Sequence, residues 1–117
     1  MYIYTDGSGG VNSSDPRNRR VGWAWVICGP GTDVALYGEY GTLAGKQTVP
    51  RAEMTAVIRA LLHVKTTGLR ITKVTLWSDS KVVVQGYNRG KVHTLQSMLV
   101  TDWEDLWEQA EAGTHIW

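Results

Sequence analysis

The sequence of 117 residues lacks several features that mark particular classes of protein. It has one cysteine, Cys28, so neither an intramolecular disulfide framework nor a cysteine-rich zinc site can form. The single cysteine and an N-terminus without a signal-peptide pattern predict an intracellular protein, cytoplasmic or nuclear, that is not secreted. No apolar run approaches the roughly 20 residues that a membrane-spanning helix needs, so we expect no membrane partner.

An excess of one charge is also missing, because 12 Lys and Arg stand against 11 Asp and Glu, for a net charge of +1. A global field therefore does not predict a nucleic-acid or membrane partner, and binding of that kind requires a local patch. Phe is absent, whereas six Trp are present. The charged fraction of 20% and the hydrophobic fraction of 43% are typical of a folded globular chain. The length predicts one domain, residues 1–117.

The hydrophobic pattern changes period along the chain and predicts an α/β fold. Residues 2–6, 21–28 and 33–40 have strand character and are separated by Gly- and Pro-rich breaks, which predicts a three-stranded antiparallel meander. The following elements are expected to be a helix from Pro50 to about residue 66, a strand over 71–78, a short helix over 80–86, a polar loop over 87–96, a helix over about 97–112, and a strand from Thr114. Strands joined through a helix pair in parallel, so we expect a mixed five-stranded sheet with helices packed on it.

Three acidic residues fall where α/β proteins usually place their chemistry. Asp6 is expected at the end of the first strand and Asp79 at the end of the fourth, and parallel neighbouring strands bring such ends to one edge of the sheet. Glu53 is expected in the first turn of the helix between them. Converging carboxylates repel one another unless cations bridge them, and hard oxygen ligands select Mg²⁺ or Mn²⁺. Taken singly, each acid also fits the commoner role of a turn, cap or helix-dipole residue.

Three motifs, in this order, resemble those of the type 1 ribonuclease H family. They are Tyr4-Thr5-Asp6-Gly7-Ser8, then Arg51-Ala52-Glu53-Met54 at the start of an Ala-rich helix, then Trp77-Ser78-Asp79-Ser80-Lys81. The resemblance covers nearly the whole chain and implies an RNase H-like α/β fold. It implies a metal-dependent endonuclease that hydrolyses the RNA strand of RNA–DNA hybrids by a two-metal-ion mechanism, with Mg²⁺ as cofactor and Mn²⁺ as a substitute.

The same resemblance implies roles for individual residues. Asp6, Glu53 and Asp79 match the family's catalytic, metal-binding carboxylates. Ser8, Arg51 and Ser78 fall beside them at positions that contact or frame the substrate, and Arg89 and Lys91 lie in the place of the family's basic protrusion. A separate basic group, formed by Arg17, Arg19 and Arg20, fits either phosphate contacts or a solvated loop.

The resemblance ends with the predicted fifth strand. The family continues into a loop with a His and a last helix with a fourth carboxylate, and no residue of this chain matches either. We therefore expect a domain that is C-terminally incomplete relative to the family, truncated after the start of strand 5, whose activity is weak because the fourth acid is absent. Two alternatives stay open: a catalytically silent fragment or assembly module that needs a partner segment, and a related retroelement or exonuclease domain with another nucleic-acid substrate.

The aromatic residues of the predicted sheet suggest an uncovered surface. By alternation, Trp23 and Trp25 share one face of the second strand, and we expect this face to continue through Tyr2, Tyr4 and Trp77. The smaller residues would then pack under the two long helices. An aromatic face of this size exceeds what monomers normally expose, which predicts a homodimer or a partner polypeptide that covers it.

Overall fold

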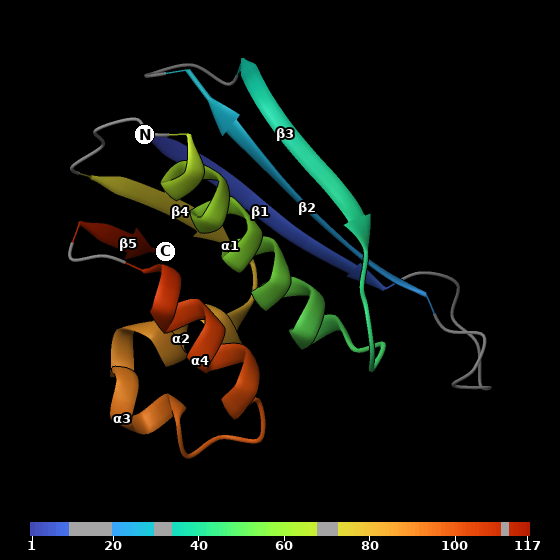
Figure 1. The fold of residues 1–117 in the computed structure, drawn as a ribbon, viewed down its shortest axis with the longest axis vertical. Coiled ribbons are helices and arrows are strands. Elements are labelled where there is room, and N and C mark those ends of the chain that lie inside the picture. Colours follow the sequence, from blue (N-terminus) through green and yellow to red (C-terminus); the bar gives the residue numbers. More distant parts are fainter. Residues whose placement is uncertain (10–19, 30–33, 68–72, 111–112) are drawn as a thin grey trace.

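The structure is a computed structural model that describes residues 1–9, 20–29, 34–67, 73–110 and 113–117. Its elements follow the predicted order (Figure 1). They are β1 (Tyr2–Gly9), β2 (Val21–Cys28), β3 (Ala35–Thr42), α1 (Val49–Thr66), β4 (Val74–Ser78), α2 (Lys81–Arg89), α3 (Lys91–Thr94), α4 (Val100–Gln109) and β5 (Thr114–Ile116). None of these helices is both long and apolar enough to cross a bilayer.

The five strands form one mixed sheet in the order β3-β2-β1-β4-β5. β1, β2 and β3 pair antiparallel, as a meander requires, whereas β4 pairs in parallel with β1 and with β5. The α/β class and the mixed five-stranded sheet predicted from the pattern are therefore confirmed. The parallel pair β1–β4 places the chain around Asp6 beside the chain that leads into Asp79, as the strand-end argument requires.

Helix α1 lies across the sheet and forms the centre of the core. Thr48, its extended N-cap residue, precedes Pro50 in the first turn, where the missing amide hydrogen of a proline costs nothing. The side facing the sheet carries small residues at four-residue spacing, Ala52, Ala56 and Ala60, which let the helix approach the strands closely. Beside them Met54 and Val57 are completely buried. Each such side chain contributes about 1.5–3 kcal/mol by leaving water.

The prediction that Trp23 and Trp25 share a face of the sheet with Tyr2, Tyr4 and Trp77 is wrong. The antiparallel register pairs Trp25 with Thr5 and Trp23 with Gly7, so both indoles point towards α1 and are buried. Tyr4 instead pairs with Val26 on the opposite face. Alternation determines which residues of one strand share a face. Which faces of two strands lie on the same side of the sheet depends on their pairing register, because a shift of one residue moves every side chain to the opposite face.

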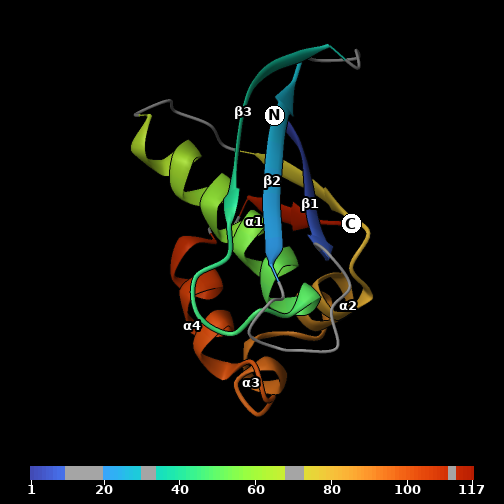
Figure 2. The ribbon, with the colours of Figure 1, turned by 90° about the vertical axis from the view of Figure 1, so that its right-hand side faces the viewer.

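The opposite face of the sheet nevertheless carries exposed aromatic side chains. Tyr2, Tyr4 and Trp77 are each more than two-fifths exposed, and Trp117 lies beside Trp77 with ring centroids 6.5 Å apart. Figure 2 shows α1 and α4 together on the other side of the sheet. Among the residues that the structure describes, no helix covers these four aromatic residues, which we call the open face.

Two helical segments differ from their predicted bounds. Ser80 is the N-cap of α2, as predicted, and its hydroxyl accepts a hydrogen bond from the Val83 amide at 3.3 Å. The polar stretch 87–96 is not a loop, because α2 continues to Arg89 and α3 follows after a corner at Gly90, whose φ is +103°. The polar sequence of this segment did not indicate a helix, because its stability comes from contacts with α2 and α4 and not from an amphipathic pattern of its own. α4 is shorter than the predicted helix over about 97–112, because it begins at Val100 and ends at Gln109.

Candidate active site

The three predicted carboxylates come from three elements, and two of their local settings differ from expectation. Asp6 lies within β1 and not at its end, because the glycines that follow continue to pair with β2 as far as Gly9 and Val21. Glu53 is the fifth residue of α1, just beyond its first turn. Asp79 follows the last residue of β4 directly, as predicted.

A close approach of β1 and α1 brings Asp6 and Glu53 into one neighbourhood. A β-carbon placed on Gly7 would lie 2.5 Å from the Glu53 amide nitrogen and 2.8 Å from the carbonyl carbon of Ala52. Any side chain at position 7 would therefore push the helix away from the strand. Glycine at this position is what allows the backbone that carries Glu53 to lie against the residue after Asp6.

The carboxyl group of Glu53 has an unfavourable environment for a negative charge. Only 7% of the residue is exposed, and its Oε2 atom is buried without a hydrogen-bond partner among the described residues. Burial is the largest cause that raises the pKa of Glu53, and the charges of Asp6 and then Asp79 raise it further, while a hydrogen bond from the Gly7 amide opposes them. Asp6 and Asp79 therefore both lie near enough to Glu53 to raise its pKa.

Hard oxygen donors and an unpaired buried oxygen fit a divalent cation. Across the described parts of the chain, however, no three His, Cys, Asp or Glu side chains are gathered closely enough to make a preformed metal site. Because like charges repel, three carboxylates of this kind would come close together only when a cation is bound between them. The residues present therefore fit a bound Mg²⁺ or Mn²⁺, and the unpaired Oε2 of Glu53 is the strongest single indication.

The hydroxyl groups near the carboxylates have different roles. Thr5 donates from Oγ1 to the carbonyl of Trp77 at 3.1 Å and so joins the strands that carry Asp6 and lead to Asp79. Ser78, a predicted substrate residue, accepts from the amide of Ser80 at 3.1 Å through Oγ and shapes the turn after β4. Ser8 is exposed on the same side of β1 as Asp6 and stays available for a substrate.

Arg51 is occupied within the protein, contrary to the expected substrate contact. Its Nη1 donates to the carbonyls of Ala44 at 3.1 Å and Lys46 at 2.5 Å, and its Nε lies 3.5 Å from Asp102 Oδ2 on α4. The guanidinium group thus ties the segment before α1 to α4. The framing role implied by the resemblance fits this arrangement better than contact with a substrate.

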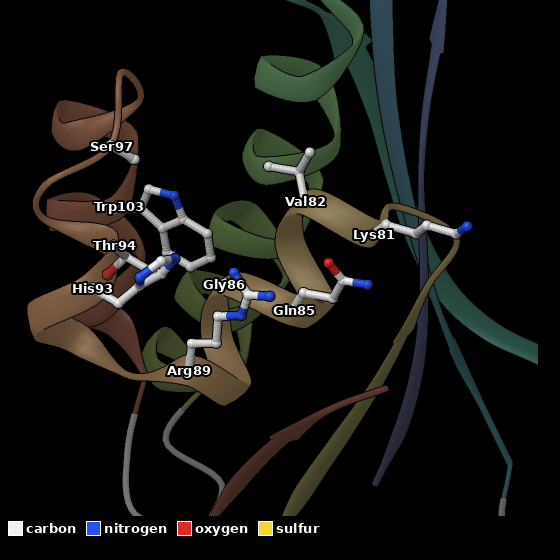
Figure 3. A pocket seen from close by; sticks show the side chains of 9 residues that line it. All are labelled: Lys81, Val82, Gln85, Gly86, Arg89, His93, Thr94, Ser97 and Trp103. Atoms are coloured by element: carbon white, nitrogen blue, oxygen red, sulfur yellow. The ribbon is translucent and has the colours of Figure 1, made fainter.

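A cavity of about 190 Å³ lies between α2 and the α3–α4 segment (Figure 3). Its basic lining residues are Lys81, Arg89 and His93, and we call this cavity the basic pocket. Figure 3 shows Arg89, His93 and Trp103 gathered on one side of α2, while Lys81 extends from the first turn of the helix, two residues after Asp79.

The basic pocket only partly matches the predicted basic residues. Arg89 lines it, whereas Lys91 is not among its lining residues, and the substrate contacts of both stay predictions. Sequence reasoning did not single out Lys81 and Gln85. The signal was available, because Lys81, Gln85 and Arg89 are spaced by four residues and so share one face of a helix. Arg17 and Arg19 lie outside the described residues, and Arg20 lies just before β2.

Comparison with known proteins shows the family of the chain. Residues 1–114, nearly the full length, match the RNase H family. The chain belongs to this family. No curated protein sequence matches it.

Solved structures share the RNase H fold at low sequence identity. LC11-RNase H1, crystallised with an RNA/DNA hybrid, has a TM-score of 0.74 at 22% identity, over 99% of this chain and 82% of that protein. RNase H1 from the halophilic archaeon Halobacterium salinarum has a TM-score of 0.67 at 24% identity, over 99% and 82%. The protease-reverse transcriptase of prototype foamy virus has a TM-score of 0.73 at 22% identity, over 99% of this chain but only 17% of that larger protein.

Proposed function

We propose that this chain hydrolyses the RNA strand of RNA–DNA hybrids, with two divalent ions held by Asp6, Glu53 and Asp79. The observation that carries the proposal is the buried, unpaired Oε2 of Glu53 together with the influence of both aspartates on the pKa of that residue. A carboxylate in this setting is costly without a cation to neutralise it. Family membership supports the reaction, and hybrid-bound LC11-RNase H1 supports the substrate.

The chain's own residues would position the substrate for this reaction. When bound, two divalent ions lower the pKa of the attacking water and neutralise the charge that develops at the scissile phosphate. Asp6 lies on β1, the central strand of the sheet, and would hold the ions together with Glu53 and Asp79. Ser8 lies two residues after Asp6, and Ser78 directly precedes Asp79. We expect their hydroxyl groups to contact the sugar, whose 2′-hydroxyl distinguishes RNA from DNA at the cut strand.

The basic pocket would hold the backbone of the nucleic acid beyond the site of cleavage. Lys81 lies two residues after Asp79. Arg89 lies eight positions further along α2, which corresponds to about 12 Å at 1.5 Å per residue. Cations spread over this length can contact more than one phosphate. Contacts of this kind position a nucleic acid without reading its bases, so we expect little base specificity. Lys91 lies outside the lining of the pocket, and its proposed contact is peripheral.

A cleavage assay with end-labelled substrates tests the proposal. RNA–DNA hybrid, double-stranded RNA and double-stranded DNA of one sequence are incubated with the protein and Mg²⁺, Mn²⁺ or a chelator. We expect metal-dependent cleavage of the RNA strand of the hybrid alone, weak in Mg²⁺ and stronger in Mn²⁺, which generally binds mixed ligand sets more tightly. A folded protein that is inactive with both ions would contradict the proposal.

A second candidate function is that of a catalytically silent assembly module, and the open face favours it. Tyr2, Tyr4, Trp77 and Trp117 form an exposed aromatic surface on the face of the sheet opposite the buried side chains of β1. A second copy of the chain or another polypeptide that covered this face would bury apolar area at a gain of about 25 cal/mol per Å². Sedimentation at micromolar concentration distinguishes a monomer from a dimer, and a monomer at all concentrations would count against self-association.

A further inference from the structure

Helix α3 forms one wall of the basic pocket but is too short to hold its own position. It has four residues, Lys91–Thr94, and an isolated helix of this length is not stable in water. It carries His93 and Thr94, which both line the pocket. The corner before it is Gly90, where the backbone enters the left-handed region. The position of this wall must therefore come from contacts with neighbouring helices.

Thr94 makes these contacts, although it is an uncharged residue that no sequence motif contains. It is 1% exposed, and its Oγ1 accepts a hydrogen bond from Trp107 Nε1 of α4 at 2.7 Å. The same hydroxyl donates to the carbonyl of Lys91 at 2.9 Å, and the Thr94 carbonyl accepts from the amide of Ser97 at 3.1 Å. The buried side chain of Thr94 thus joins α4 to the first residue of α3, and its main-chain carbonyl joins α3 to Ser97.

The other end of this hydrogen-bond chain is anchored in the sheet. The ring of Trp107 stacks on Tyr87 of α2, with centroids 4.8 Å apart and planes 16° from parallel. The hydroxyl of Tyr87 donates to the carbonyl of Thr114 in β5 at 2.9 Å. The position of Trp107, and through it that of Thr94, is therefore set by β5 and α2 together, and both of these elements are fixed relative to Asp79.

The methyl group of Thr94 also touches α2 where the helix has no side chain. A β-carbon on Gly86 would lie 3.4 Å from Thr94 Cγ2 and 2.4 Å from the ring of Trp103. Thr94 therefore fits between two helices with its methyl group towards α2 and its hydroxyl towards α4. Valine has the same shape but cannot accept the Trp107 hydrogen bond, and serine keeps the hydroxyl but loses the methyl group.

We propose that Thr94 is a positioning residue for nucleic-acid binding, which sets the wall of the basic pocket by joining α3 to Trp107 and so determines affinity for the hybrid without taking part in cleavage. This inference rests on the proposed function, because it assumes that the basic pocket holds the nucleic-acid backbone. It assigns to a buried hydroxyl an effect on binding that would otherwise be attributed to the basic side chains of the pocket alone.

The test compares Thr94→Val and Thr94→Ser with the wild-type chain. Steady-state cleavage of a labelled RNA–DNA hybrid in Mn²⁺ gives kcat and KM, and thermal unfolding of each variant gives its stability. Loss of one buried hydrogen bond corresponds to roughly a fivefold to tenfold change in an equilibrium constant. We expect KM of Thr94→Val to rise by about that factor with kcat unchanged within about twofold. Thr94→Ser should restore KM to near the wild-type value.

Two further variants make the test specific to the hydrogen bond. Thr101→Val is the matched control, because Thr101 is exposed on α4 away from the pocket lining, and its KM should not change. Trp107→Phe keeps an aromatic ring to stack on Tyr87 but removes the Nε1 donor, so it should raise KM as Thr94→Val does. The double variant should raise KM by less than the two single changes combined, because both remove the same hydrogen bond. If Thr94→Val does not fold, Trp107→Phe tests the same hydrogen bond from the other partner.

Two results would overturn the inference. An unchanged KM in Thr94→Val or Trp107→Phe, with only thermal stability lowered, would show that the hydroxyl is purely structural. A fall in kcat at constant KM would place its effect on the reaction instead of on binding. A wild-type chain that neither binds nor cleaves the hybrid would refute the proposed function itself, an outcome that is visible before any variant is compared.

Discussion

A β-carbon on Gly7 would lie 2.5 Å from the backbone nitrogen of Glu53, so the strand that carries Asp6 and the helix that carries Glu53 touch at their main chains. This contact connects two sequence motifs that are 46 positions apart, which is the separation of residues 7 and 53. It lies beside a Glu53 residue of which only 7% is exposed.

Gly7→Ala should remove both stability and activity. The added methyl group must push α1 away from β1, and overpacking of this kind costs about 1–3 kcal/mol. Gly9→Ala is the matched control, since a β-carbon there meets Val49 Cγ2 at an ordinary 3.4 Å. Denaturant unfolding and hybrid cleavage of the two variants test the prediction. Wild-type activity in Gly7→Ala would show that the close approach does not matter for the site.

Asp79→Asn should abolish metal-dependent cleavage, because an amide oxygen is a weaker ligand for a hard cation than a carboxylate. It should also raise the melting temperature measured in chelator, since one of the charges that raise the pKa of Glu53 is removed. Asp105→Asn removes an exposed acid of α4 and should change neither quantity. Full activity in Asp79→Asn would refute its assignment as a metal ligand.

The raised pKa of Glu53 predicts a pH dependence of stability with a definite sign. Because the folded-state pKa lies above the value of 4.5 for an unperturbed Glu, the folded state favours the protonated form. The stability from this group is fully present below the unfolded pKa and is lost as pH rises through the folded pKa. Glu53→Gln should remove this decline. The measurement is the free energy of unfolding in chelator at several pH values for both proteins, and identical pH profiles would contradict the prediction.

Arg51→Lys should lower stability more than it lowers activity per folded molecule. Lysine keeps the positive charge but cannot reproduce the contacts of the guanidinium group with two carbonyls and Asp102. Because the group is partly exposed, we expect a loss of about 1–2 kcal/mol in unfolding free energy. A large rise in KM without loss of stability would instead restore the expected role of Arg51 as a substrate contact.

The tryptophans should differ in their access to a quencher. Trp77 and Trp117 lie on the open face, whereas Trp25 and Trp103 are about 2% exposed. Iodide should therefore quench Trp77 strongly, and Trp77→Phe should reduce the quenchable fraction far more than Trp25→Phe. If quenching of Trp77 falls as protein concentration rises, the open face is covered by another copy. Quenching that is independent of concentration would refute self-association through this face.

Local patterns were sufficient to predict the order of the strands and of the longer helices, and the position of Asp79 directly after β4. Pro50 and the helical spacing after it located α1, Ser80 located the start of α2, and the strand that ends before Asp79 was recognised from its β-rich composition. These predictions succeed because helix caps and hydrophobic periods depend on residues only a few positions apart. The continuation of β1 past Asp6 was missed, since a Gly-Ser-Gly run becomes a strand only where a neighbouring strand pairs with it.

The contacts between distant segments that periodicity and spacing did not predict were decided by tertiary structure. The burial of Trp23 and Trp25 depends on the register between β1 and β2, which alternation within either strand does not contain. The engagement of Arg51 with α4 and the joining of α3 to Trp107 through Thr94 depend on helix packing. The nearly unexposed carboxyl group of Glu53 depends on the close approach at Gly7. Such contacts follow from which surfaces bury the most apolar area together, a property of the whole chain that no short stretch carries.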